Sequence, residues 1–75
     1  MEIERISIDS QVNVARFARI KGGIDLEMCK IILRHENGTP DIDDIDAAAT
    51  MNLLCRIGAV KHNMLDSYEF WTPVK

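Results

Sequence analysis

Residues 24–38, IDLEMCKIILRHENG, carry the strongest structural signal in the chain. Their apolar side chains recur at the spacing of an α-helix, and the charges Glu27, Lys30 and Arg34 share one narrow stripe. A helix with so little polar surface is buried on most of its sides. Gly38 suits the left-handed turn that ends many helices. We therefore expect a core helix that stops at Gly38.

The segment that follows, TPDIDDIDAAATMNLL at residues 39–54, places four aspartates before an apolar run. Asp41 is a suitable N-cap, and carboxylates in the first turns of a helix interact favourably with its dipole, by about 0.3–1 kcal/mol each. We expect a helix from about Asp41 to Ile57, ended by Gly58. One of its apolar faces carries Ile42, Ile45, Ala49, Leu53, Ile57 and Val60, and the other carries Met51, Leu54 and Cys55. The aspartates are thus interpreted first as a helix start and second as an acidic contact for a partner.

The N-terminal part of the chain gives weaker signals. Residues 1–8, MEIERISI, favour a short strand because isoleucine is common in strands. Asp9 or Ser10 then offers an N-cap for a helix that ends at Gly22 and Gly23. Residues 10–20 also fit a strand, so the choice between helix and strand stays open at this point.

The C-terminal part indicates a β-hairpin. Residues 59–63, AVKHN, and 68–74, YEFWTPV, are typical of two strands joined by residues 64–67, MLDS, with Pro73 ending the pairing. The expected fold is α+β: a small three-helix core with a C-terminal hairpin, which the N-terminal strand can join. Residues 1–75 form one domain, since a chain this short builds a single small core.

Charge and composition exclude several classes of protein. The net charge is −3, and residues 41–60 hold one basic and four acidic side chains, so the surface is not that of a basic polyanion binder. No signal-peptide pattern opens the chain, and no apolar run approaches the length of about 20 residues that a membrane span requires. We expect a cytoplasmic protein without a membrane span, with Cys29 and Cys55 as reduced, buried thiols.

The residue spacing disfavours two kinds of metal site. A calcium loop that starts at Asp41 needs an oxygen ligand, a glycine and a glutamate where Ile45, Asp46 and Asn52 stand. The residues of a possible zinc site are Cys29, His35, Cys55 and His62. Their gaps, C-x5-H and C-x6-H, differ from the close pairs of structural zinc sites. We therefore expect no metal, no cofactor and no catalytic residues, and hence no enzyme.

Residues 53–60, LLCRIGAV, followed by the aromatic strand YEFWTPV, are similar to the winged-helix (winged helix-turn-helix) family, and the resemblance extends over residues 24–75. The matching residues are Leu53, Ile57, Gly58, Val60, Tyr68 and Phe70. The resemblance implies that Leu53 and Ile57 face the core and that HNMLDS forms the wing tip. It also implies that the third helix holds the recognition position. By this analogy Thr50, Asn52 and Arg56 reach base edges, and Lys61 and His62 lie near phosphate.

Two functional hypotheses follow. The preferred one is a small non-enzymatic protein-interaction module with a winged-helix-like fold, a homodimeric regulator or accessory protein. Its expected partner-binding residues are Asp43, Asp44, Met51, Leu54 and Trp71, and Met64 and Leu65 are further apolar positions that a small core leaves unburied.

The alternative is a winged-helix DNA-binding regulator of transcription. Its expected DNA-binding residues are Arg16, Arg19, Lys21, Thr50, Asn52, Arg56 and Lys61. Phosphate contacts supply most of the affinity of DNA-binding proteins, and the third helix opens with four carboxylates. The charge pattern therefore favours a protein partner over nucleic acid.

Overall fold

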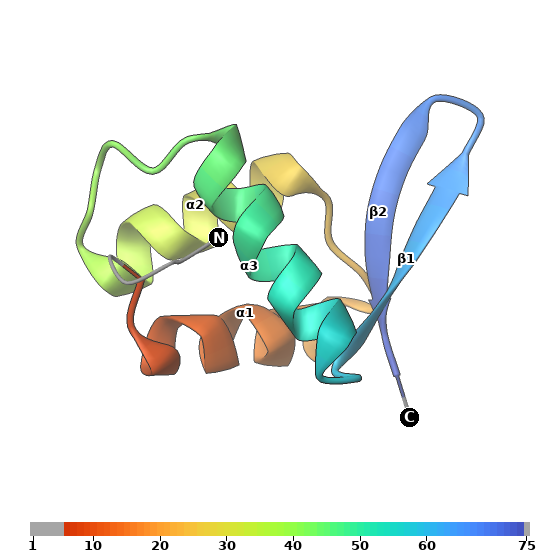
Figure 1. The fold of residues 1–75 in the computed structure, drawn as a ribbon, viewed down its shortest axis with the longest axis horizontal. Coiled ribbons are helices and arrows are strands. Elements are labelled where there is room, and N and C mark those ends of the chain that lie inside the picture. The colour runs from red at the N-terminus through yellow and green to blue at the C-terminus, as the bar shows by residue number, and fades with distance from the viewer. Residues whose placement is uncertain (1–5, 75) are drawn as a thin grey trace.

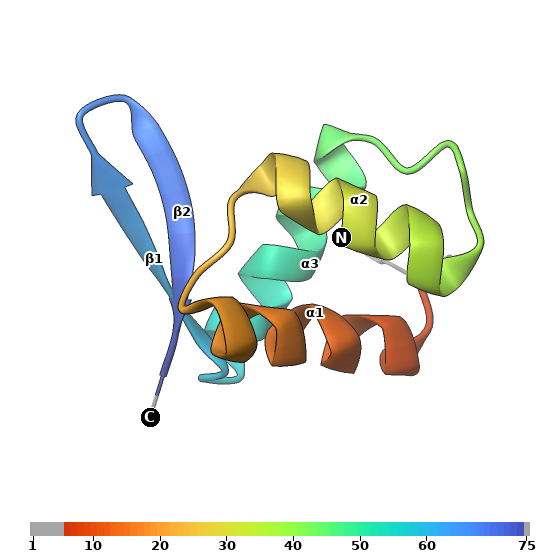
Figure 2. The same ribbon diagram turned by 180° about the vertical axis from the view of Figure 1, so that it is seen from behind.

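The computed structural model describes residues 6–74, which form three helices followed by a two-stranded antiparallel hairpin. The helices are α1 (Ile8–Lys21), α2 (Leu26–Asn37) and α3 (Asp44–Arg56), and the strands are β1 (Val60–Leu65) and β2 (Tyr68–Pro73). Figure 1 shows α3 crossing in front of α1 and α2, with the hairpin beside the helices. Figure 2 shows α2 lying above α1 on the opposite side. The predicted α+β fold, helices first and hairpin last, is confirmed.

The core lies between the three helices and the base of the hairpin. Its buried apolar residues are Ile6, Val14, Ala18, Ile24, Cys29, Ile32, Leu33, Ile42, Ala47, Met51, Leu54, Val60 and Trp71. Every element contributes at least one of them, which is typical of a small domain that has room for a single core. Within residues 6–74 no helix combines the length and the apolarity that crossing a membrane would require.

The sequence left open whether residues 10–20 form a helix or a strand, and in the structure they are helical. The cap is Ser7, whose side chain accepts a hydrogen bond from the Ser10 amide at 3.1 Å, and the prediction of Asp9 or Ser10 as N-cap is wrong. Ser10 instead turns inward, where its hydroxyl donates to Asn37 Oδ1 at 3.2 Å and ties the start of α1 to the end of α2.

The N-terminal strand predicted over residues 1–8 is not formed where the chain is described. Residues 1–5 lie outside the described residues, Ile6 and Ser7 precede α1 without strand pairing, and Ile8 opens the helix. The Ser7 cap supplies the reason for residues 6–8, because it starts the helix at Ile8.

Helix α2 confirms the helix predicted over residues 24–38 but begins at Leu26. Asp25 caps it by accepting from the Met28 amide at 2.9 Å, and Gly38 ends it in the left-handed conformation, with φ of 68°. The start is later than predicted because the backbone of Ile24 is paired with β2.

Helix α3 begins at Asp44, so the predicted start at Asp41 is wrong. Asp43 is the N-cap and forms a capping box with Asp46, in which each carboxylate accepts from the other residue's backbone amide. Asp44 stands three residues after Asp41 and could complete the same kind of box there, but its carboxylate is instead bound by Lys30 of α2 at 2.8 Å.

The core-facing side of α3 also differs from the prediction. Its buried residues are Ala47, Thr50, Met51 and Leu54, whereas Ile45 and Ile57 are exposed. The implied placement of Ile57 in the core is therefore wrong. On the buried side α3 lies close to α2, and the Cys29 Sγ is 3.9 Å from the Ala47 carbonyl oxygen.

The hairpin is held to the helices by the connection between α1 and α2. Ile24 and Trp71 exchange two backbone hydrogen bonds, each 2.8 Å long, so Ile24 forms a single bridge with β2. β1 extends to Leu65, two residues further than predicted, and Asp66 and Ser67 make the turn. Pro73, paired with Val60, is the last residue of the register, as predicted.

Gly23 is where this connection requires glycine. A Cβ at Gly23 would lie 3.2 Å from the Trp71 carbonyl oxygen, and its φ of 155° is disfavoured for other residues. We expect Gly23→Ala to lower the free energy of unfolding by about 1–3 kcal/mol in urea denaturation. Gly22→Ala is the matched control, because Gly22 also has a positive φ but a Cβ there meets nothing within 4 Å. Equal losses in the two variants would contradict the close approach.

Candidate interaction surface

The side of α3 that faces away from the core carries an apolar stripe. Ile45, Ala49, Leu53 and Ile57, named here the α3 stripe, recur every four residues and so lie on successive turns. Ile45 is 62% exposed and Ile57 is 65% exposed, while Ala49 and Leu53 are half-buried. Because a row spaced by four residues winds slowly around a helix with 3.6 residues per turn, the α3 stripe crosses the outer side of α3 obliquely, with an exposed isoleucine at each end.

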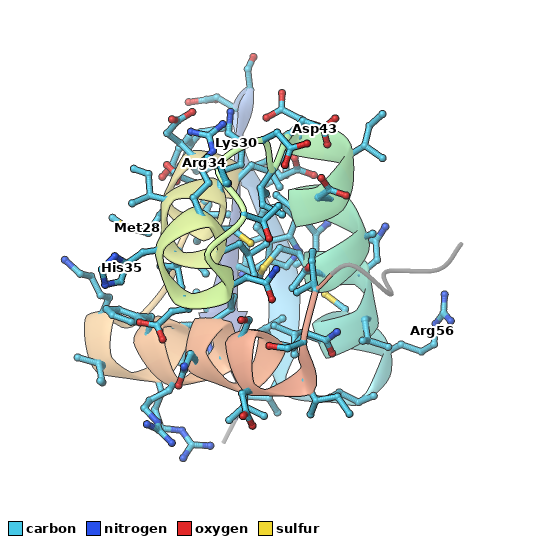
Figure 3. The ribbon with its side chains drawn as sticks, turned by 90° about the vertical axis from the view of Figure 1, so that its left-hand side faces the viewer. Met28, Lys30, Arg34, His35, Asp43 and Arg56 are labelled. Atoms are coloured by element: carbon cyan, nitrogen blue, oxygen red, sulfur yellow. The ribbon has the colours of Figure 1, made fainter. Side chains whose placement is uncertain are left out.

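Two polar side chains accompany the α3 stripe. Asn52 and Arg56 are exposed and stand one turn apart on the same side of the helix. Figure 3 shows Arg56 extending from α3 away from the other helices. Both side chains can donate hydrogen bonds to a ligand on this face.

Carboxylates and two cations of α2 gather at the N-terminal end of α3, as Figure 3 shows for Asp43, Lys30 and Arg34. Lys30 Nζ lies 2.8 Å from Asp44 Oδ1, and the hydrogen bonds to Asp44 and Glu27 raise the pKa of Lys30. Arg34 donates from Nε and Nη2 to the Ile42 carbonyl, at 3.1 and 2.8 Å. The acidic cluster thus starts α3 and connects it to α2.

The residues predicted to bind a partner divide between surface and core. Asp43 and Asp44 are exposed, while Met51, Leu54 and Trp71 are all buried. Met51 and Leu54 join Ala47 at helical spacing on the buried side of α3. The exposed isoleucines of α3, Ile45 and Ile57, lie away from this buried side.

The other two apolar positions expected on the surface, Met64 and Leu65, are exposed near the turn of the hairpin. Trp71 lies between the core and the hairpin, with its ring centroid 5.2 Å from that of His62. Its indole Nε1 is buried, and no group among residues 6–74 accepts its hydrogen.

The residues predicted to bind DNA lie on three elements. Thr50 is buried and its hydroxyl donates to the Asp46 carbonyl at 3.0 Å, so it does not reach the surface of α3. Asn52 and Arg56 are exposed on α3, and Lys61 is exposed on β1. The three cations of α1 are Arg16, Arg19 and Lys21, all exposed. Of the three residues predicted to reach base edges, two are on the surface.

Hydrogen bonds also position the hairpin. The Tyr68 hydroxyl donates to Asp25 Oδ2 at 2.8 Å, and the His62 and Glu69 side chains lie 2.8 Å apart. The pKa of Asp25 is lowered most by the hydrogen bond from the Met28 amide and next by the one from the Tyr68 hydroxyl. The hydrogen bond between Tyr68 and Asp25 also raises the pKa of Tyr68. The N-cap of α2 is thereby linked to the start of β2.

The side chains of the disfavoured metal sites do not come together. Among residues 6–74 no three histidine, cysteine, aspartate or glutamate side chains are placed to hold a metal ion.

Sequence reasoning missed an open hollow at the end of α2, lined by Ile31, Arg34, His35, Gly38 and Pro40. A comparison of the chain with protein families, curated proteins and solved structures gave no match.

The two thiols provide a test of the core. Cys29 is buried, and burial raises the pKa of its thiol to about 12, whereas Cys55 is half-buried. Because the thiolate is the reactive form, we expect the Cys55→Ser variant to react with a disulfide reagent such as dithionitrobenzoate only after denaturation. Labelling of this variant under native conditions, as fast as that of the unfolded chain, would contradict the packing around Cys29.

Acid titration tests the cap at Asp25. Its folded-state pKa is lowered, so the carboxylate stabilises the fold above the unfolded pKa of about 3.9, and this contribution is lost as the pH falls through the folded-state value. Asp25→Asn keeps a good N-cap but removes the charge. We expect its free energy of unfolding, measured in urea, to fall less steeply than that of the wild type below about pH 4. Parallel curves for the two proteins would show that the Asp25 charge contributes nothing.

Proposed function

We propose that the protein is a small non-enzymatic protein-interaction module and that the outer face of α3 is its contact surface. The supporting observation is the exposure of Ile45 and Ile57 at the two ends of the α3 stripe. Single exposed apolar residues are normal on protein surfaces, but here the half-buried Ala49 and Leu53 join the two exposed isoleucines into a larger apolar patch, and such patches often mark an interface. The row extends over twelve residue steps, or about 18 Å of helix.

The composition of this face matches the centre of a protein interface. Such centres are poor in charged residues, and Ala49, Asn52 and Leu53 at the middle of the face are all uncharged. The carboxylates stand at one end and Arg56 at the other, where a polar rim is expected.

The charges around α3 weigh against strong DNA binding. A helix in the major groove lies between phosphates, which must be neutralised by Lys or Arg. Here Asp43, Asp44 and Asp46 lie at the start of α3, and the neighbouring cation Lys30 is already paired with Asp44.

A second candidate is a winged-helix regulator that binds DNA. The order of helix, single bridge at Ile24, two helices and hairpin agrees with the winged-helix arrangement, in which a helix precedes the first short strand. Asn52 and Arg56, exposed one turn apart, are side chains that read adenine and guanine edges in the major groove. These observations support the candidate, although the carboxylates oppose it.

Matched isoleucine substitutions test the proposal. Ile45→Ser combined with Ile57→Ser removes the ends of the α3 stripe. The control is Ile8→Ser combined with Ile20→Ser on α1, where the side chains are 75% and 73% exposed. In a pull-down, the bait is one of the three proteins, and the prey is a lysate of the source cells or a tagged second copy of the chain. We expect the wild type and the control to retain prey protein and the α3 variant to lose it. The reason is that only the α3 variant loses apolar contact area in the proposed surface.

Fluorescence anisotropy with random duplex DNA decides between the two candidates. Binding that weakens steeply with added salt and is reduced by Arg56→Ala would contradict the proposal and support the DNA-binding regulator. The same contradiction would follow if the α3 variant retained every protein that the wild type retains.

A further inference from the structure

We infer that the α3 stripe is covered by a second copy of this chain, with the two α3 helices packed antiparallel about a two-fold axis near Asn52. The inference rests on the proposed function, because it names the partner of the same surface. Most soluble oligomers are symmetric, and a two-fold interface requires one patch to be complementary to itself. The α3 stripe meets this requirement in both shape and charge.

The spacing of the α3 stripe suits an antiparallel partner. The midpoint of the stripe is residue 51, so an antiparallel partner places Ile45 opposite Ile57 of the second copy and Ala49 opposite Leu53 of the second copy. Large side chains then meet at both ends, and the small Ala49 makes room for Leu53 on either side of the centre. Residues four apart form the ridges that fit into the grooves of a facing helix.

The two ends of α3 carry opposite charges. Asp43, Asp44 and Asp46 stand at its start, and Arg56 stands in its last turn. In an antiparallel pair each Arg56 lies beside the carboxylates of the other copy, and opposite ends of the helix dipoles also face each other. A parallel pair would instead bring the two sets of carboxylates together. Charge therefore selects the antiparallel arrangement.

The rival surface is on α1, where Ile8, Val12, Arg16 and Ile20 also recur every four residues. Arg16 interrupts that row near its middle, and Arg19 stands one turn further on. Pairing two copies through α1 would place these arginines close to the axis, where like charges repel. The middle of the outer face of α3 has no charge, so α3 is the better self-complementary surface.

The predicted interface is small. A single pair of helices of this length buries less area than a standard protein interface, so the dimer is expected to be weak and to dissociate on dilution. Molar mass should therefore be measured by light scattering and sedimentation over a wide range of protein concentration.

The first experiment compares the dimer dissociation constants of the matched isoleucine variants. Each substitution removes two side chains from the symmetric interface. We expect the Ile45→Ser, Ile57→Ser variant to raise the dissociation constant at least about tenfold, equivalent to about 1.4 kcal/mol. The Ile8→Ser, Ile20→Ser control should leave it unchanged. Circular dichroism of both variants verifies that they remain folded. A dimer that is weakened by the α1 substitutions and not by the α3 substitutions would overturn the inference.

The second experiment tests the direction of the helices by disulfide formation in a Cys55→Ser background. Asn52→Cys lies near the axis, so two copies should form a disulfide on mild oxidation. Two copies of Ile45→Cys would be about 18 Å apart along the helix and should not, whereas a mixture of Ile45→Cys and Ile57→Cys should form the mixed disulfide. Rapid disulfide formation by Ile45→Cys alone would indicate a parallel pair and overturn the inference.

Failure of this inference is distinguishable from failure of the proposed function. A chain that stays monomeric at its highest soluble concentration overturns the self-pairing. If that monomer still retains another protein through Ile45 and Ile57, the proposed function stands without the self-pairing. If it instead binds duplex DNA in a salt-dependent manner and retains no protein, both are overturned.

Discussion

The backbone pairing of Ile24 with Trp71 is the constraint on which the arrangement of this fold depends. Its two hydrogen bonds, each 2.8 Å long, hold β2 against the connection between α1 and α2. Gly23 allows the close approach, and the buried Trp71 side chain joins the core on the inner side of the strand. The hairpin is thereby fixed beside the helices, as Figure 1 shows, and does not fold across α3. Ile45 and Ile57 on the outer side of α3 stay exposed in this arrangement of residues 6–74.

A second constraint decides which side of α3 is uncovered. The capping box of Asp43 and Asp46 sets the start of the helix, and Lys30 and Arg34 of α2 hold that end in place. With its start fixed, the small residue Ala47 faces α2, and Met51 and Leu54 follow at helical spacing into the core. The larger Ile45 is turned outward by the same geometry. The aspartates therefore fix the position of α3 in the fold, and this position determines which of its side chains are exposed.

The elements were largely predictable from the sequence, but the surfaces were less so. Helix α2 and the hairpin follow from local signals, namely the apolar periodicity, Gly38 and the strand-forming residues around Tyr68. Helix α3 has two apolar sides, and periodicity alone does not say which of them packs inward. That choice is made by contacts between residues distant in the chain, such as that of the Ala47 carbonyl with Cys29 of α2. The bridge at Ile24 was missed for the same reason, since one residue paired with β2 leaves no local pattern.

The central claim is that the outer face of α3 contacts protein, and foremost a second copy of the chain. The most direct measurement is a dilution series of amide chemical shifts by nuclear magnetic resonance, which reports every residue of the folded chain at once. The account predicts concentration-dependent shifts concentrated between Ile45 and Ile57, at Ala49, Asn52 and Leu53 above all. Shifts that are confined to α1, or that are absent up to the highest soluble concentration, would contradict the self-pairing of α3.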